Sequence, residues 1–229
     1  MPNFNDGKSF IIAIDGFSSC GKSTLAKDLA QKLSFIYVDT GAMYRSVSLF
    51  FLSNHISVDT QADYSDLLDA QVEIEFRTNG GKRLTFLNGN NVEDQIRSPK
   101  VANVVSDVAA NSSVRRFLVA QQRKMGATQS LVMDGRDIGS VVFPNAQVKF
   151  FVTADIDVRT KRRFDELKAK GVQTTMTEVK HNLSMRDEKD SNREDSPLVK
   201  VDDAIVIDTT DHTRESQMLL ALEHVMSKF

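Results

Sequence analysis

Short runs of almost continuous apolar residues recur along the chain, and most of them end in a polar residue. The runs are Phe10–Asp15, Phe35–Thr40, Ser130–Asp134, Val148–Ala154 and Ala204–Asp208. Continuous rather than alternating apolarity is typical of strands in a parallel sheet that is covered on both faces. The pattern therefore predicts five buried parallel strands.

Segments with apolar residues three or four positions apart lie between these runs and predict helices. One helix is expected over Ser23–Leu33, where leucine recurs every four residues. A second helix is expected to begin at Pro99, with Ser98 as its N-cap and valines along its apolar face. Further helices are expected over Ser113–Gly126, where the glycine should end the helix, and from about Thr213 onward. Alternating strands and helices predict an open α/β sheet that binds ligands at the carboxyl ends of its strands.

Residues 71–89 depart from this plan because apolar and polar residues alternate there. Val72, Ile74 and Phe76 alternate with glutamates, and a turn at Asn79-Gly80-Gly81 leads into a second alternating segment. This pattern predicts an antiparallel hairpin. We expect roughly residues 60–100 to form a small inserted subdomain.

Composition narrows the class of protein. The chain has 229 residues, a formal net charge of −2 and one cysteine. Its 41% hydrophobic and 26% charged residues are close to the averages of globular proteins, which excludes disordered, collagen-like and coiled-coil classes. A balanced charge argues against a nucleic-acid partner, and a single cysteine suits a reducing interior. The N-terminus does not resemble a signal peptide, and the longest apolar runs fall short of the ~20 residues of a membrane span. We expect a cytosolic protein that binds neither nucleic acid nor membranes.

A glycine-rich loop directly follows the first apolar run. The segment is Gly16-Phe17-Ser18-Ser19-Cys20-Gly21-Lys22-Ser23, and with the strand before it and the helix after it, it fits the phosphate-binding motif G-x-x-x-x-G-K-[ST]. Its backbone N–H groups and the helix N-terminus favour phosphate oxygens. Lys22, which we expect on an exposed loop, would reach the β- and γ-phosphates, and the Ser23 hydroxyl would ligate Mg²⁺. The loop predicts nucleotide binding but not the reaction.

Three further motifs contain candidate functional residues. Asp39–Arg45 (DTGAMYR) follows the second run, Asp134–Gly139 (DGRDIG) follows the third, and Arg186–Arg193 (RDEKDSNR) precedes the last. Taken alone, each also fits a structural role, as a turn, a strand-end cap or a solvated helix face. Two of them lie at strand carboxyl ends, as the glycine-rich loop does, and this favours one shared site. The guanine motif Asn-Lys-x-Asp of a GTPase is absent from the sequence.

With these motifs in view, the sequence resembles the bacterial cytidylate kinases over essentially its whole length. The resemblance rests on GxSxxGKST, D[ST]GAxYR, DGRDxGxxVFP and RDxxDxxR followed by Pro197-Leu198. It implies a P-loop NTPase fold with a five-stranded parallel sheet flanked by helices, an inserted α/β subdomain for the nucleoside monophosphate and a helical lid. The implied boundaries are 1–59 and 101–229 for the core, about 157–193 for the lid and 60–100 for the insertion.

The resemblance also implies roles for individual residues. The ATP site would comprise the loop and one lid arginine: Gly16, Phe17, Ser18, Ser19, Cys20, Gly21, Lys22, Ser23, Thr24 and Arg162. Residues that contact CMP would be Thr40, Tyr44, Arg45, Ser106, Arg115, Asp134, Arg136, Asp137, Arg186, Asp190 and Arg193. Of these, the cytosine-facing set would be Ser106, Arg115 and Asp137, and Asp190 would hold the sugar hydroxyls. The catalytic cations would be Lys22, Arg136, Arg186 and Arg193.

The implied activity is transfer of the γ-phosphoryl group of ATP to CMP or dCMP by a monomer, with Mg²⁺ as the metal. The second pKa of a phosphate monoester is about 6, so the acceptor is already ionised and needs no general base. Asp134 could orient magnesium-bound waters or could serve only as a structural cap. Two alternatives stay open: a kinase for another monophosphate such as UMP, and a P-loop regulatory nucleotide-binding protein.

The chain departs from the usual family pattern at a few positions. Phe17 stands where proline is common, and Lys189 and Ser191 stand where relatives often carry arginines. Cys20 has two readings: a reactive thiol if it is exposed beside Lys22, or an inert small residue that points away from the phosphates.

Overall fold

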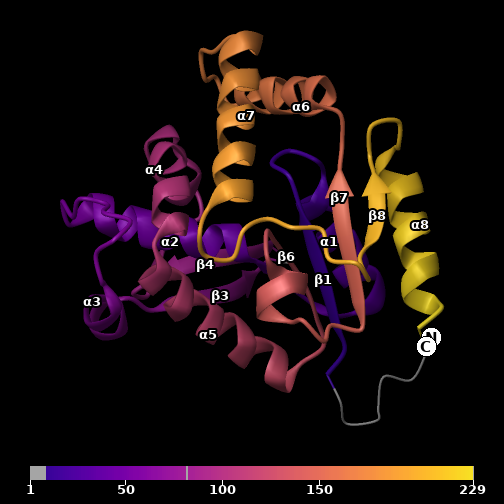
Figure 1. Ribbon diagram of the computed structural model, residues 1–229, viewed down its shortest axis with the longest axis horizontal. Helices are drawn as coiled ribbons and strands as arrows, with labels where there is room; N and C mark the ends of the chain where they lie inside the picture. The colour runs from indigo at the N-terminus through magenta and orange to yellow at the C-terminus, as the bar shows by residue number, and fades with distance from the viewer. Residues whose placement is uncertain (1–8, 81, 229) are drawn as a thin grey trace. The chain divides into compact units, whose positions relative to one another are not determined.

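The computed structural model describes residues 9–80 and 82–228, which form two compact units (Figure 1). One unit comprises the described residues through Val38 and those from Met125 onward, and the other is Asp39–Lys124. The second unit begins before and ends after the insertion expected at 60–100. The first eight residues, on which the absence of a signal peptide was judged, and Gly81 of the expected turn lie outside the described residues.

The five apolar runs form the strands of one sheet, as predicted. In chain order they are β1 (Ile11–Gly16), β2 (Ile36–Asp39), β6 (Leu131–Gly135), β7 (Val148–Thr153) and β8 (Ile205–Asp208). Their order across the sheet is β2-β6-β1-β7-β8, and β1 pairs in parallel with both β6 and β7. Every residue of β1 is buried, because this central strand is covered on both faces. The expectation that all five strands are buried is wrong for the edge strand β8, in which Val206 is 47% exposed. The carboxyl end of β1 therefore delivers the glycine-rich loop to the middle of the sheet edge.

Two helices pack against the sheet through their apolar faces. They are α1 (Lys22–Leu33) and α8 (Arg214–Met226), which lies beside β8 in Figure 1. Leu25 and Leu29 of α1 join Ile12 and Ile14 of β1 in one buried cluster, which Val225 of α8 completes. This core anchors the start of α1 and hence the loop that precedes it.

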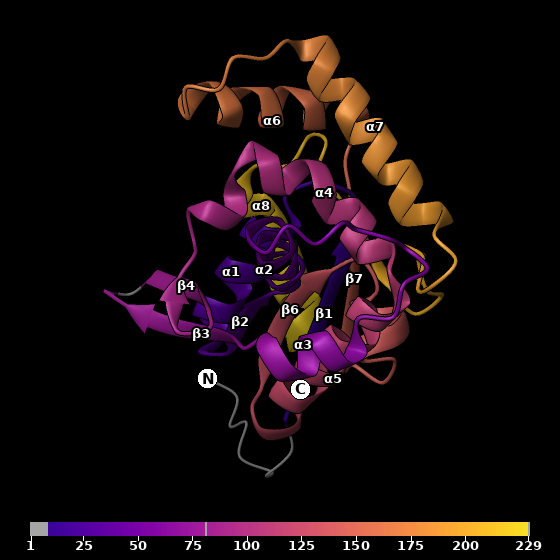
Figure 2. The ribbon, with the colours of Figure 1, turned by 90° about the vertical axis from the view of Figure 1, so that its left-hand side faces the viewer.

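A pair of helices follows β7 and corresponds to the expected lid. They are α6 (Ile156–Ala169) and α7 (Met176–Asn192), which lie next to one another in Figures 1 and 2. The Asp155 side chain caps the start of α6. Thr175 and Glu178 form a reciprocal capping box at the start of α7, which sets where that helix begins.

The unit Asp39–Lys124 contains the hairpin that the alternating segment predicts. Its elements are α2 (Thr40–Ser53), α3 (Ser65–Gln71), β3 (Ile74–Asn79), β4 (Lys82–Leu87), β5 (Asn90–Asn91), the 3₁₀ turn η1 (Gln95–Arg97), α4 (Pro99–Ala110) and most of α5 (Ser112–Thr128). Strands β3 and β4 pair antiparallel, and β5 adds a short third strand that the pattern did not predict. Ser98 is the N-cap of α4, as expected, but its side chain accepts no capping hydrogen bond from the described residues.

Gly126 does not end its helix, contrary to the sequence expectation. Helix α5 continues through it to Thr128. A Cβ at this glycine would lie 2.5 Å from the ring of Phe143 and 3.2 Å from Ile11 Cδ1. Glycine is therefore needed here for close packing against the ring rather than to terminate the helix.

A search of the described residues for a helix long and apolar enough to cross a bilayer finds none.

Candidate active site

The end of β1 approaches β7 so closely that its last residue, Gly16, must be glycine. Gly16 has φ 149°, and a Cβ there would lie 2.0 Å from the carbonyl oxygen of Val152. Helix α1 begins at Lys22, and the carbonyl of Gly21 accepts the first helical hydrogen bonds. The glycine-rich segment is therefore a tight strand–loop–helix turn, as the motif requires.

Lys22 is buried within this turn, which corrects the expectation that it lies on an exposed loop. Only 7% of the residue is exposed, and its Nζ donates to the carbonyl oxygen of Phe17 at 2.9 Å. Burial lowers the pKa of Lys22, and the neighbouring Arg136 guanidinium lowers it further. An anion bound in the loop would offset both effects, because it would supply the missing negative charge.

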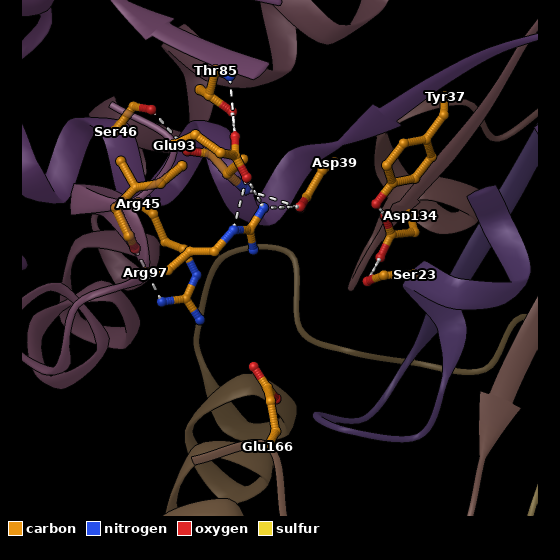
Figure 3. Close-up of polar contacts among 12 residues, drawn as sticks. Ser23, Tyr37, Asp39, Arg45, Ser46, Thr85, Glu93, Arg97, Asp134 and Glu166 are labelled. Carbon is orange, nitrogen blue, oxygen red and sulfur yellow. Dashed lines mark hydrogen bonds and ion pairs between the residues drawn. The ribbon is translucent and has the colours of Figure 1, made fainter. Parts of the chain in front are cut away.

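Asp134, at the end of β6, ties the start of α1 to β2. Its Oδ2 accepts from the Ser23 hydroxyl at 2.6 Å, and its Oδ1 accepts from the Tyr37 hydroxyl at 2.8 Å (Figure 3). The carboxylate thus lies directly beside the side chain expected to ligate Mg²⁺. The described residues hold no group of three or more His, Cys, Asp or Glu that could bind a metal ion. A hydroxyl and one carboxylate fit the sparse protein ligation of Mg²⁺, which usually keeps waters and substrate phosphates as its other ligands.

Arg136 links the loop to the lid. Its Nη2 donates to the Ser18 hydroxyl at 2.8 Å, and its Nε lies 2.7 Å from Asp190 Oδ2 on α7. Burial opposes both charges, but the carboxylate of Asp190 raises the pKa of Arg136, and the guanidinium lowers the pKa of Asp190. Both groups are therefore ionised at neutral pH.

Arg193 completes the same cluster just after α7. Its Nη2 lies 3.6 Å from Asp137 Oδ1, its Nη1 lies 4.0 Å from Asp190 Oδ1, and its Nε donates to the Ser196 carbonyl at 2.7 Å. The motif after β6 and the charge run at the end of α7 thus converge, as the resemblance implied.

Arg186 differs from its neighbours in that its Nε has no hydrogen-bond partner among the described residues. The side chain is half-buried on α7. Burial lowers its pKa to about 10, and the charge of Arg136 adds to this effect. The group remains a cation at neutral pH and has an N–H donor available for an acceptor oxygen.

The lid arginine expected at the ATP site reaches the loop through a threonine. Arg162 donates to the hydroxyl and the carbonyl of Thr209 at 2.9 and 2.7 Å, and the Thr209 hydroxyl donates to the Cys20 carbonyl at 2.7 Å. The Cys20 side chain is fully buried in the sheet–helix core. Its burial supports the reading as an inert small residue, and the exposed reactive thiol is excluded.

The remaining expected CMP residues lie in the unit Asp39–Lys124. Thr40 is the buried first residue of α2, and Arg115 on α5 is buried with its Cζ 5.5 Å from the Tyr44 ring centroid. Arg45 is half-buried on α2, with Nη1 3.5 Å from the Ile96 carbonyl. Ser106 is half-buried on α4.

The same unit contains an ion-pair network that the sequence reasoning missed. Arg97 donates from Nε and Nη2 to Glu93 Oε1 at 2.8 and 2.6 Å, and its Nη2 lies 3.4 Å from Asp39 Oδ2 (Figure 3). Glu93 in turn accepts from the backbone and hydroxyl of Thr85. Asp39 caps α2 by accepting from the backbone N–H of Ala42, so the network braces the start of the helix that carries Thr40. An isolated arginine before a helix gives no sequence signal for this role.

Comparisons with known sequences find one family over almost the whole chain. The cytidylate kinase family profile matches residues 12–227 of the chain. A cytidylate kinase from Flavobacterium johnsoniae is 50% identical over 222 residues, which cover 95% of this chain and 96% of that protein. One from Bacteroides fragilis is 47% identical over 214 residues, which cover 92% and 93%.

Among solved structures, the crystal structure of an uncharacterized protein from Eubacterium ventriosum has a TM-score of 0.52 and 15% identity. The match covers 96% of this chain and 99% of that chain. At this identity, the likeness concerns the fold alone.

Proposed function

Because the chain belongs to the cytidylate kinase family, we propose that it transfers the γ-phosphoryl group of ATP to CMP or dCMP, giving ADP and CDP or dCDP. The main structural support for this reaction is the cluster of arginines beside the glycine-rich loop. Arg136 and Arg193 are held by carboxylates, and Arg186 keeps an N–H donor without a partner among the described residues. A fixed set of guanidiniums is suited to phosphate oxygens, which they bind bidentately.

The residues of this chain would act by binding, orientation and charge stabilisation. Lys22 would leave the Phe17 carbonyl for the donor phosphates, and Arg136, Arg186 and Arg193 would spread the charge of the transferring phosphoryl group. No general base is assigned, because the phosphate acceptor is largely ionised at neutral pH.

Ser23 and Asp134 would hold Mg²⁺, the Ser23 hydroxyl directly and Asp134 through its contact with that hydroxyl. When bound, the metal would neutralise charge on the phosphate oxygens of ATP. The closeness of the two side chains favours the magnesium-related role of Asp134 over a purely structural cap.

For the acceptor, we assign base recognition to Ser106, Arg115 and Asp137 and sugar recognition to Asp190. Thr40, Tyr44 and Arg45 would complete the acceptor site. We also propose that the chain acts as a monomer, as the family resemblance implies. The single cysteine suits a cytoplasmic reaction.

The proposal is tested by ATP turnover with Mg²⁺ and each of CMP, dCMP, UMP and AMP in turn. We expect kcat/KM for CMP or dCMP to exceed that for UMP and AMP at least tenfold, since about 1.4 kcal/mol of differential binding gives this ratio. Preference for UMP or AMP would favour the kinase for another monophosphate. ATP binding without turnover of any acceptor would favour a regulatory nucleotide-binding protein.

A further inference from the structure

One buried ion pair at the base of the lid has no part in the reaction proposed above. Arg159 Nη1 on α6 lies 2.5 Å from Asp187 Oδ2 on α7, and both side chains are largely shielded from solvent. The pair therefore joins the two helices of the lid.

Both members of the pair also contact the glycine-rich loop at the same residue. The backbone N–H of Ser18 donates to Asp187 Oδ1 at 3.3 Å, and Arg159 Nη1 donates to the carbonyl of Ser18 at 3.3 Å. The Arg159 Cζ also lies 5.2 Å from the ring centroid of Phe17, within the range of a cation–π contact. The two lid helices are thus held to one point of the loop.

The guanidinium of Arg159 is already engaged by the protein. Besides Asp187 and Ser18, its Nε donates to the carbonyl of Ala154 at 2.9 Å, and only 7% of the residue is exposed. Arg186, in contrast, has an Nε without a partner among the described residues. Arg159 is therefore suited to hold the lid in place, and Arg186 is suited to meet a phosphate.

Two carboxylates fix the rotation of α7 about its own axis. Asp187 and Asp190 are three residues apart and lie on one face of the helix. Asp187 is held at Ser18 and Arg159, and Asp190 is held at Arg136. Arg186 immediately precedes Asp187, so the direction of its side chain depends on these two contacts.

We propose that Asp187, held by Arg159, is a positioning residue that fixes Arg186 for phosphoryl transfer without itself touching substrate. This inference rests on the proposed function. The structural alternative is an ion pair that only stabilises the packing of α6 on α7. The two differ in whether the effect of Asp187 on turnover depends on Arg186.

A double-mutant cycle between Asp187 and Arg186 separates these possibilities. Asp187→Asn is expected to lower kcat with ATP and CMP by about ten- to a hundredfold, the range caused by misplacing a catalytic group. In the Arg186→Ala background, the same substitution should cause no further loss, because the group that it positions is gone. Losses that multiply in the double variant would overturn the proposal.

The matched control is Lys180→Met. Lys180 pairs with Asp157 at 2.6 Å and so also joins α7 to α6, but this exposed pair lies apart from the loop. We expect kcat to stay within about twofold of the parent value, because exposed pairs contribute at most ~1 kcal/mol. A loss equal to that of Asp187→Asn would show that general lid stability, and not positioning, governs turnover.

A second variant and a second measurement distinguish loss of positioning from misfolding. Asp187→Glu keeps the charge and is expected to recover part of the lost kcat, and no recovery would count against positioning by charge. Amide hydrogen exchange over residues 16–24 in the nucleotide-free protein should accelerate in Asp187→Asn but not in Lys180→Met. Unchanged exchange would overturn the loop contact, whereas absence of turnover in the parent protein would overturn the proposed function instead.

Discussion

At the residue scale, Lys22 is a cation buried inside the glycine-rich loop. Burial lowers its pKa, and the charges of Arg136 and Arg186 lower it further. Binding of an anion stabilises the charged form of a buried cation more than that of an exposed one. The residue is therefore better suited to ligand binding than to stabilising the empty loop.

Lys22→Ala is expected to lower phosphoryl transfer at least a hundredfold, a loss typical of removing one group that stabilises transition-state charge. The unfolding temperature should change little, because the substitution also removes repulsion from the neighbouring arginines. Lys32→Ala, an exposed lysine on the same helix, is the control and should keep the parent turnover. Steady-state kinetics would contradict the assignment if Lys22→Ala stayed within about threefold of the parent.

Asp15, at the end of β1, makes the stability of the fold depend on pH. Its carboxylate accepts from the backbone N–H groups of Ile138 and Gly139 at 2.8 and 2.7 Å. Burial nevertheless raises the pKa of Asp15 from 3.8 to about 7. The folded state therefore binds a proton more tightly than the unfolded state, and this contribution to stability is lost as the pH rises from about 4 to about 7.

The measurement is the free energy of unfolding of the parent minus that of Asp15→Asn, determined by denaturant titration between pH 5 and 8. The difference should fall with rising pH up to about 7, by at most about 1.4 kcal/mol per pH unit, and then level off. A difference that stays flat or rises with pH would show that Asp15 is ionised throughout.

At the scale of elements, packing against Phe143 rather than helix termination accounts for the glycine at position 126 of α5. In most helices alanine is better than glycine by about 1 kcal/mol. At position 126, however, an added Cβ would lie 2.5 Å from the Phe143 ring. The local preference and the packing therefore have opposite effects.

Gly126→Ala is expected to destabilise the protein by about 1–3 kcal/mol, the usual cost of overpacking. Thermal unfolding of this variant and of Gly126→Ala/Phe143→Leu checks the cause, because the smaller side chain should restore part of the loss. Stabilisation by the single substitution would show that helix propensity outweighs the contact.

The elements that the sequence predicts best are those with a strong period. The five strands and the β3–β4 hairpin follow from apolar runs and from alternation, because burial imposes those patterns directly. The charge run at the end of α7 could not be read this way. A solvated helix face and a buried ion-pair cluster have the same residues, and only the fold brings Asp187 to Ser18 and Asp190 to Arg136.

At the scale of the whole molecule, the net charge gives no indication of the cationic site. The chain carries a formal charge of −2, yet Arg136 and Arg186 lie close enough to Lys22 to add to the lowering of its pKa by burial. Composition predicted no such cluster, since it counts charges without placing them. The sheet-edge argument brought Arg136 to the glycine-rich loop, since strand carboxyl ends meet at one edge of a parallel sheet, but only the family resemblance implied that Arg186 joins them.

Following a label from the γ-phosphate distinguishes transfer from ATP to CMP from simple hydrolysis of ATP. The protein is incubated with γ-labelled ATP, Mg²⁺ and CMP, and the products are separated over time. We expect the label to appear in CDP in a one-to-one ratio with ADP and little of it to be released as inorganic phosphate. Label that appears chiefly in inorganic phosphate, at a rate independent of CMP, would contradict the proposed transfer.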